Sequence, residues 1–380
     1  MTSDGYTTRR DLLRTGAVTT SIGILGTAGC IGQGDTGSGS RNQTDGTGSG
    51  SESSGPKAQL VYAGGEQAGA TYQMASGMAQ VVRQQTNNRI TFNLQTTGGT
   101  EEDFRGITDE IFDMCAATTP SIWRAASGKD PFNKKHDLNI MFTTAVFPFP
   151  IAYTITENED INYMEDLEGK TMATGPPGDT GHFYWVAYCK ANGIDLDSMK
   201  FQRITSDEGF RLLNDGRVDG VISGATNDSP GPAAQQWLAR TDGAKLVVPK
   251  TSERSLKLGE YVGGGIVWDL KLENFESAWE NSVVSEENTY KFIAGTDTQT
   301  TSIDRISDEV AYEITKLTIE HREKLIDYHN LWGGFANDVG KFAMAMRMQD
   351  AEAAPYVPGA ARAMKEAGIW NDEFPVAERE

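Results

Sequence analysis

From residue 58 onward the chain alternates short apolar runs with segments of helical periodicity, and this alternation restricts the fold more than any other feature. Strands are predicted at 60–63, 89–95 and 111–117, and helices at 71–85 and 101–109. Parallel strands need long crossover connections, which helices usually supply. The pattern therefore predicts an α/β fold with a mostly parallel sheet and helices on its faces.

A second series of the same kind begins near residue 150. Its strands are predicted at 151–156, 201–204 and 218–223, and its helices at 183–192 and 207–214. Beyond about residue 290 the pattern becomes helical, and a stripe of apolar residues is expected to face a core: Val310, Ile314, Leu317 and Leu325. We therefore expect two α/β lobes. The predicted boundaries are 58–148 for lobe I, 149–287 for lobe II, and 288–380 for the return to lobe I and the C-terminal helices.

The first 57 residues have the composition of an export signal followed by a linker. Arg9 and Arg10 precede a short apolar run at 16–28, which is too short for a transmembrane helix of about 20 residues. This is the pattern of a twin-arginine signal peptide, although a chance arginine pair would look alike. The run ends in Ala-Gly-Cys, which resembles a lipobox and predicts lipidation of Cys30, although Thr27 replaces the usual aliphatic residue. Cleavage would remove 1–29 and leave 30–57 as the lipidated cysteine and a flexible Gly/Ser linker on the extracytoplasmic face of the membrane.

The chain is strongly acidic, with 53 Asp and Glu against 34 Lys and Arg and a net charge of −19. This charge argues against binding to nucleic acid, and against any membrane contact other than the lipid anchor. The acidic residues are spread along the whole chain, which favours a halophilic protein whose surface charges are screened by concentrated salt. Of the three cysteines, Cys115 and Cys189 are expected to be buried thiols, with a disulfide between them as the alternative.

Enzymatic motifs find little support in the sequence. Lys170 and Thr171 imitate the end of a P-loop, but Met164 stands where its first glycine is required. Ser223 lacks the spacing of a nucleophile elbow, and the four histidines lack zinc-site spacing. His182 follows a glycine-rich loop and is interpreted as a core or surface residue, with ligand contact as the alternative. We expect no enzyme activity, cofactor or metal.

Glycine-rich loops follow the predicted strands, at the edge where α/β sheets bind ligands. Backbone N–H groups at helix starts can bind a carboxylate there, and glycine permits close approach. The candidate ligand-binding residues are Gly69, Ala70, Thr71, Tyr72, Thr97, Gly98, Gly99, Thr100, Thr118, Thr119, Pro177, Gly178, Asp179, Thr180 and Gly224. Alternatively, these residues only form turns and caps.

Asp179 is the exception among these residues, because a carboxylate would repel an anionic ligand and favour an amino group. Alternatively, it caps its own helix. We expect a small organic solute, an amino acid or a carboxylate such as glutamate, enclosed by hinge motion about segments near 147–150 and 285–295.

Six motifs in order resemble the TAXI family of substrate-binding proteins, which serve tripartite ATP-independent periplasmic (TRAP) transporters. They are Gly-Ala-Thr-Tyr at 69–72, Thr-Gly-Gly-Thr at 97–100, Asp-Leu-Glu-Gly-Lys at 166–170, Asp-Gly-Arg-Val-Asp-Gly at 215–220, Pro-Gly-Ala-Ala-Arg at 358–362 and Lys-Glu-Ala-Gly-Ile-Trp at 365–370. The resemblance, of haloarchaeal type, implies a two-lobed periplasmic-binding-protein-like (type II) fold with a ligand cleft between the lobes. It also implies delivery of the solute to a TRAP-type permease. A solute sensor for a signalling receptor and a secreted enzyme on the same fold are the alternatives.

Overall fold

A computed structural model describes most of the part of the chain that is expected to fold. The described residues are 55–149, 153–223, 225–226, 229–241, 245–251, 253, 256, 266–271, 289–339 and 353–379. The predicted signal peptide, Cys30 and Gly224 lie outside them, as do nearly all of the linker and parts of both proposed hinge segments.

The first sheet, which we call lobe I together with its helices, has a parallel half and an antiparallel half. Its strands are β1 (Ala58–Ala63), β2 (Ile90–Gln95), β3 (Met114–Thr118), β4 (Asn139–Phe149), β12 (Ile266–Lys271) and β13 (Thr289–Thr301). Their order is β12-β13-β3-β1-β2, and β4 pairs with β13. The strands β1, β2 and β3 are parallel, whereas β13 is antiparallel to its neighbours.

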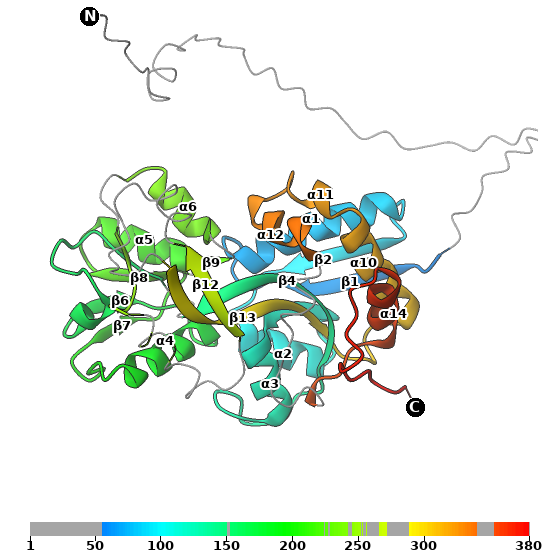
Figure 1. The fold of residues 1–380 in the computed structure, drawn as a ribbon, viewed down its shortest axis with the longest axis horizontal. Helices are drawn as coiled ribbons and strands as arrows, with labels where there is room; N and C mark the ends of the chain where they lie inside the picture. The colour runs from blue at the N-terminus through cyan, green and yellow to red at the C-terminus, as the bar shows by residue number, and fades with distance from the viewer. Residues whose placement is uncertain are drawn as a thin grey trace, which may run out of the picture. The chain divides into compact units, whose positions relative to one another are not determined.

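Three helices follow the parallel strands: α1 (Ala70–Gln85), α2 (Thr100–Thr108) and α3 (Thr119–Ser127). Figure 1 shows α1 on one face of the sheet and α2 and α3 on the other. The helix α1 forms because Met74, Met78 and Val81 recur on one face, and each is only 1% exposed. The predicted β-α-β-α-β order of this region is confirmed.

The second sheet, which forms lobe II, contains five strands. They are β5 (Tyr153–Thr156), β6 (Thr171–Ala173), β7 (Lys200–Gln202), β8 (Gly220–Ser223) and β11 (Lys245–Val247), in the order β11-β5-β8-β6-β7. The helical elements are η2 (Met164–Leu167), α4 (Thr180–Ala191), α5 (Ser206–Asn214) and α6 (Pro232–Leu238), and β9 (Ala225–Thr226) pairs separately with β10 (Ser229–Pro230). The hydrophobic clusters of this lobe are distinct from the single large cluster of lobe I.

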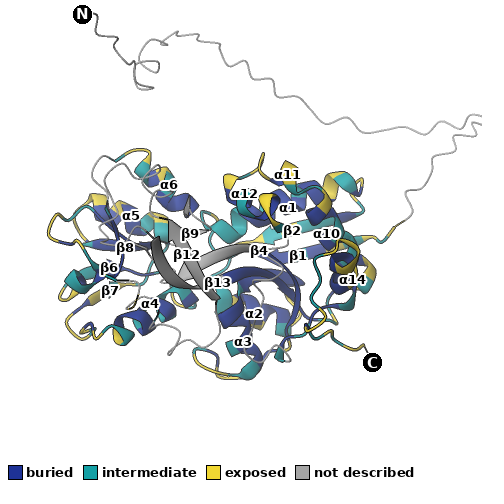
Figure 2. Ribbon diagram, viewed as in Figure 1, coloured by how far each residue is buried: buried dark blue, intermediate teal, exposed yellow. Residues whose placement is uncertain are grey.

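The C-terminal helices pack into the core of lobe I. They are α10 (Asp308–Glu320), α11 (Arg322–Leu325), η3 (Asn330–Trp332), α12 (Gly333–Asn337) and α14 (Pro358–Glu366). The predicted core residues Val310, Ile314, Leu317 and Leu325 all belong to the lobe I cluster. Figure 2 shows the buried residues concentrated on the sheets and on the helix faces that cover them.

The prediction of helix beyond about residue 290 is wrong for its first part, because β13 is a strand of 13 residues. Its last six residues are buried although all are polar, so the strand lacks the apolar alternation that marks strands in a sequence. Threonine favours strands because it is branched at Cβ, and Thr298 pairs across the sheet with Thr143 at 3.2 Å.

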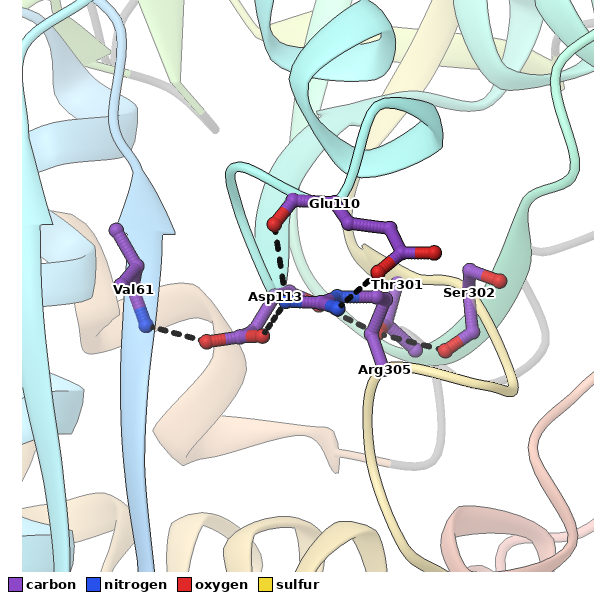
Figure 3. Close-up of polar contacts among 6 residues, drawn as sticks. All are labelled: Val61, Glu110, Asp113, Thr301, Ser302 and Arg305. Atoms are coloured by element: carbon purple, nitrogen blue, oxygen red, sulfur yellow. Dashed lines mark hydrogen bonds and ion pairs between the residues drawn. The ribbon is translucent and has the colours of Figure 1, made fainter.

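A polar cluster ties the segment after β13 to the parallel strands of lobe I (Figure 3). The Asp113 carboxylate accepts from the Val61 backbone N–H at 2.7 Å and pairs with the Arg305 guanidinium at 2.8 Å. Arg305 also pairs with Glu110 at 3.4 Å, and the Thr301 hydroxyl donates to the Asp113 carbonyl. The cluster therefore joins β1, β3 and the end of β13.

The described chain passes from lobe I to lobe II between β4 and β5, and returns between β11 and β12. The strand β12 pairs in the lobe I sheet, although the sequence placed 149–287 in lobe II. Two sheets with separate cores confirm the two-lobed α/β fold that the sequence predicted. Cys115 and Cys189 are buried free thiols, as expected. Within the described ranges, no helix is long and apolar enough to cross a membrane.

Candidate functional site

A cavity of about 190 Å³ is lined by loops from both lobes. Lobe I contributes Gly64, Gly65, Glu66, Ala68, Gly69, Ala70, Thr71, Gly98, Gly99, Thr100, Asp103 and Ala116. Lobe II contributes Pro176, Asp179, Ser206, Ser223, Gly231, Pro232 and Ala233. Most of these residues follow a strand or begin a helix, which is the usual place for a ligand in an α/β fold.

The loop between β1 and α1 forms one wall of the cavity. The helix α1 begins after Gly69 without a side-chain cap, which leaves its first backbone N–H groups available to a ligand. A side chain at Gly64 would come within 2.6 Å of the Tyr72 ring, so glycine is required where this ring packs. Tyr72 therefore supports the wall instead of lining the cavity.

The loop between β2 and α2 also lines the cavity, and the Thr97 side chain stabilises its conformation through hydrogen bonds. The Thr97 hydroxyl accepts from the Gly65 N–H at 3.1 Å and donates to the Asp103 carboxylate at 2.5 Å. Gly99 has φ of +121°, a conformation that side chains disfavour, and a Cβ there would lie 3.0 Å from the Asp179 Cα of the opposite lobe. Glycine thus lets the two lobes approach closely.

Asp179 begins α4 and is the acidic residue of the lobe II wall. Its carboxylate accepts from the Gly181 N–H at 2.6 Å, which confirms the helix-capping interpretation. The same residue lines the cavity, so the two alternatives for Asp179 do not exclude each other. Arg203 lies nearby, and its guanidinium donates to the backbone carbonyls of Gly175 and Pro176, each at 2.8 Å.

Hydrogen bonds join the lobes around the cavity. The Ser206 N–H of lobe II donates to the Glu66 carboxylate at 3.2 Å, and the Glu101 N–H of lobe I donates to the Gly178 carbonyl at 3.3 Å. The hydroxyl groups of Ser121 and Tyr184 lie 2.7 Å apart. These contacts hold the lobes in a closed arrangement.

Burial raises the pKa values of all three carboxyl groups that line the cavity. The pKa of Glu66 rises to about 7 through burial and the charges of Asp179 and Asp207, and that of Asp103 rises to about 7 through burial and the charges of Glu102 and Asp179. Burial raises the pKa of Asp179 as well, against the opposing effects of the Gly181 N–H and the Arg203 charge. None of the described lining residues is lysine, arginine, histidine or aromatic.

The structure brings seven of the predicted site residues to this cavity: Gly69, Ala70, Thr71, Gly98, Gly99, Thr100 and Asp179. Others lie beside it: Thr97 lines an adjoining hollow together with Gly98, and Gly178 and Thr180 line a third one together with His182 and Arg203. Tyr72, Thr118, Thr119 and Pro177 line none of these three hollows.

His182 does not line the main cavity. Its Nδ1 lies 2.9 Å from the Thr174 hydroxyl, and its ring packs against Phe201. Burial and the Arg203 charge lower the pKa of His182 to about 4, so the ring is neutral at pH 7.

Sequence reasoning missed several lining residues, above all Glu66 and Asp103. Glu66 directly follows the two glycines at the end of β1, a position that could have identified it. Asp103 lies in the acidic first turn of α2, where acidic residues are common for reasons of helix stability. The lining residues 231–233 begin α6, a helix that was not predicted from the sequence. Within the described ranges, no three His, Cys, Asp or Glu residues are placed to hold a metal ion.

Comparison with known proteins gives one family and a set of structural neighbours. The model of the NMT1-like family matches residues 62–260. No protein with a curated description matches the chain.

Three solved structures are similar to this chain at low sequence identity. The periplasmic aliphatic sulphonate binding protein SsuA from Escherichia coli is 12% identical, with TM-score 0.43 over 83% of this chain and 91% of its own. The GluR0 ligand-binding core from Nostoc punctiforme, in complex with L-glutamate, is 11% identical, with TM-score 0.42 over 72% and 98%. The probable amino-acid ABC transporter extracellular-binding protein YtmK from Bacillus subtilis is 12% identical, with TM-score 0.42 over 74% and 99%.

Proposed function

Since this chain belongs to the NMT1-like family, we propose that it is an extracytoplasmic solute-binding protein that captures a small organic molecule and delivers it to a membrane transporter. The observation that carries this proposal is the cavity of about 190 Å³ lined by glycine-rich loops of both lobes. A ligand held there contacts both lobes, so its binding favours the closed arrangement. A membrane partner can then distinguish the loaded protein from the empty one.

The N-terminal sequence supports a position outside the cytoplasm. The arginine pair at 9–10 and the Ala-Gly-Cys at 28–30 suit twin-arginine export followed by lipidation of Cys30. The linker then gives the folded body reach from its lipid anchor to a permease. The TAXI-like motifs favour a TRAP-type permease as this partner, and the net charge of −19 favours a haloarchaeal type.

The solute is small and polar. A cavity of about 190 Å³ suits a compact molecule, and its described lining residues offer no aromatic ring on which a flat heterocycle can stack. Amino acids and small organic acids, which the sequence suggested, fall within this size. The free N–H groups at the start of α1 and the Thr71 hydroxyl would bind an oxygen of such a solute.

Isothermal titration calorimetry with the full chain in molar salt tests the proposal. The titrants are single amino acids, organic acids, amines and sugars, and solute recovered afterwards is analysed for chemical change. We expect saturable binding of one class with the solute unaltered. The variant Thr71→Val should weaken that binding by about 1–2 kcal/mol, since it removes one hydrogen-bonding group with little change of volume. The control Thr91→Val, on β2 away from the cavity, should bind normally. Conversion of the solute, or no binding by any class, contradicts the proposal.

A further inference from the structure

The carboxyl groups of the cavity identify the class of solute within the proposed function, on which this inference rests. We propose that the cavity binds a compact solute with a protonated primary amino group, held by Glu66 and Asp103 of lobe I opposite Asp179 of lobe II. The solute carries no net negative charge, which separates it from dicarboxylic acids and from glutamate.

Asp103 has one carboxylate oxygen to which no described group of the protein donates. The residue is 3% exposed, and its Oδ1 accepts from the Thr97 hydroxyl at 2.5 Å. For its Oδ2, the described residues supply no hydrogen-bond donor, although Asp103 lines the cavity. An ammonium group in the cavity would give this oxygen a charge-assisted hydrogen bond.

Glu66 shows the same incomplete bonding from the neighbouring loop. Its Oε2 accepts from the Ser206 N–H at 3.2 Å, whereas its Oε1 is buried and has no hydrogen-bond partner. The charges of Glu66 and Asp103 both interact with that of Asp179 across the cavity. An ammonium ion between the lobes can offer three N–H donors and one positive charge to these groups.

No positive group of the protein fills this role among the described lining residues. Arg203, whose charge acts on Asp179, lines a different hollow and donates from its Nε and Nη2 to backbone carbonyls of the 174–176 segment. An anionic solute would therefore meet three acidic groups in the described lining, where only the charge of Arg203 behind Asp179, backbone N–H groups and hydroxyls offset them. Repulsion of this kind selects against anions when the charges are buried.

The arrangement favours an organic cation over a metal ion. In the described part of the chain, no cluster of three acidic, histidine or cysteine ligands converges on one point. The carboxyl groups are instead distributed over α2, the loop after β1 and the start of α4. A molecule with its amino group on the lobe I side can reach the free N–H groups of α1 with an oxygen.

The test compares amines with partners in which a hydroxyl group or hydrogen replaces the amino group. Calorimetry in molar salt uses the full chain and the pairs alanine and lactate, ethanolamine and ethylene glycol, and glutamate and glutarate. We expect one neutral or cationic amine to bind at least tenfold more tightly than its partner, and glutamate to bind more weakly than alanine. Calcium chloride and guanidinium chloride, added as competitors at low millimolar concentrations that do not unfold the protein, should displace little of the bound amine.

Two variants locate the amino group, and one matched variant serves as control. Glu66→Gln and Asp103→Asn should each weaken amine binding at least tenfold, because each keeps its shape and loses its charge. Asp109→Asn removes one exposed carboxylate at the other end of α2 and should leave affinity unchanged. Circular dichroism of each variant verifies that it folds.

The possible failures can be told apart. Equal or tighter binding of lactate or glutarate, or binding of a sugar without any amine, refutes the amine proposal and leaves the solute-binding function intact. Displacement of the amine by calcium or guanidinium shows that another cation is the true ligand. If no compound of any class binds, the proposed function fails together with this inference.

Discussion

The replacement Asp103→Asn should stabilise the protein, although it removes a residue of the proposed site. Asp103 is nearly fully buried, and burial together with neighbouring acidic residues raises its pKa. The ionised carboxylate is therefore less stable in the folded protein than in the unfolded chain, and its ionisation lowers the free energy of unfolding. The amide is similar in shape, and its oxygen can still accept from the Thr97 hydroxyl, which donates to Asp103 at 2.5 Å.

The size of the effect follows from the pKa. Folding raises the pKa of Asp103 from its ordinary 3.8 to about 7. The difference of about 3 pKa units, at about 1.4 kcal/mol each, corresponds to at most about 4 kcal/mol. Below about pH 4, Asp103 is protonated in both the folded protein and the unfolded chain, so it costs no stability. As pH rises towards 7, the unfolded chain loses this proton first and the loss of stability grows. Above about pH 7 that loss is constant. The gain from Asp103→Asn should thus be near zero at about pH 4 and reach at most about 4 kcal/mol at about pH 8.

Denaturant unfolding, followed by circular dichroism at several pH values between these limits, measures the gain in the ligand-free protein. Asp109→Asn, which removes an exposed carboxylate from the same helix, corrects for the general loss of negative charge. A gain that is independent of pH would contradict the reasoning. So would a loss of stability at about pH 8, which would mean that the ionised carboxylate has donors that stabilise it in the fold.

Two further predictions concern lobe closure and export. The variant Gly99→Ala places a Cβ 3.0 Å from the Asp179 Cα, in a backbone conformation with φ of +121° that side chains disfavour. We therefore expect solute affinity to fall by about 1–3 kcal/mol, and small-angle scattering to show a larger radius of gyration in the presence of solute. Unchanged affinity would show that these loops need not approach each other. Replacing Arg9 and Arg10 by lysine should leave the protein in the cytoplasm, and Cys30→Ser should release exported protein into the medium. Cell fractionation measures both results. A double-lysine variant found at normal levels on the cell surface would refute the twin-arginine assignment.

The sequence predicted those parts of the fold whose periodicity is strong. The strand β2 and the helix α1 lie within one residue of their predicted bounds, because alternation and the i, i+4 spacing of Met74 and Met78 are local signals. The strand β13 gave no such signal, since its buried residues from Thr296 to Thr301 are polar and pair with a neighbouring strand that is distant in sequence. Partners distant in sequence decide its structure.

The candidate site also contains some residues that the sequence could predict and others that it could not. Glycines such as Gly98 and Gly99 were predicted because close backbone approach restricts the residue type. Glu66 and Asp103 were missed because an acidic residue near a helix start usually faces solvent. Only the tertiary fold buries these two carboxyl groups and places Asp179 opposite them.

The return of the chain to lobe I has a consequence for biosynthesis. The core of lobe I contains residues from Leu60 to Phe374, so it cannot be completed until nearly the whole chain has left the ribosome. The described strands of lobe II are synthesised much earlier, since the last of them ends at Val247. A nascent chain of that length would hold a folded second lobe beside a first sheet without β12 and β13, whose exposed strand edge is open to wrong pairing. Chaperones that recognise this protein should therefore act mainly on the amino-terminal third, late in synthesis.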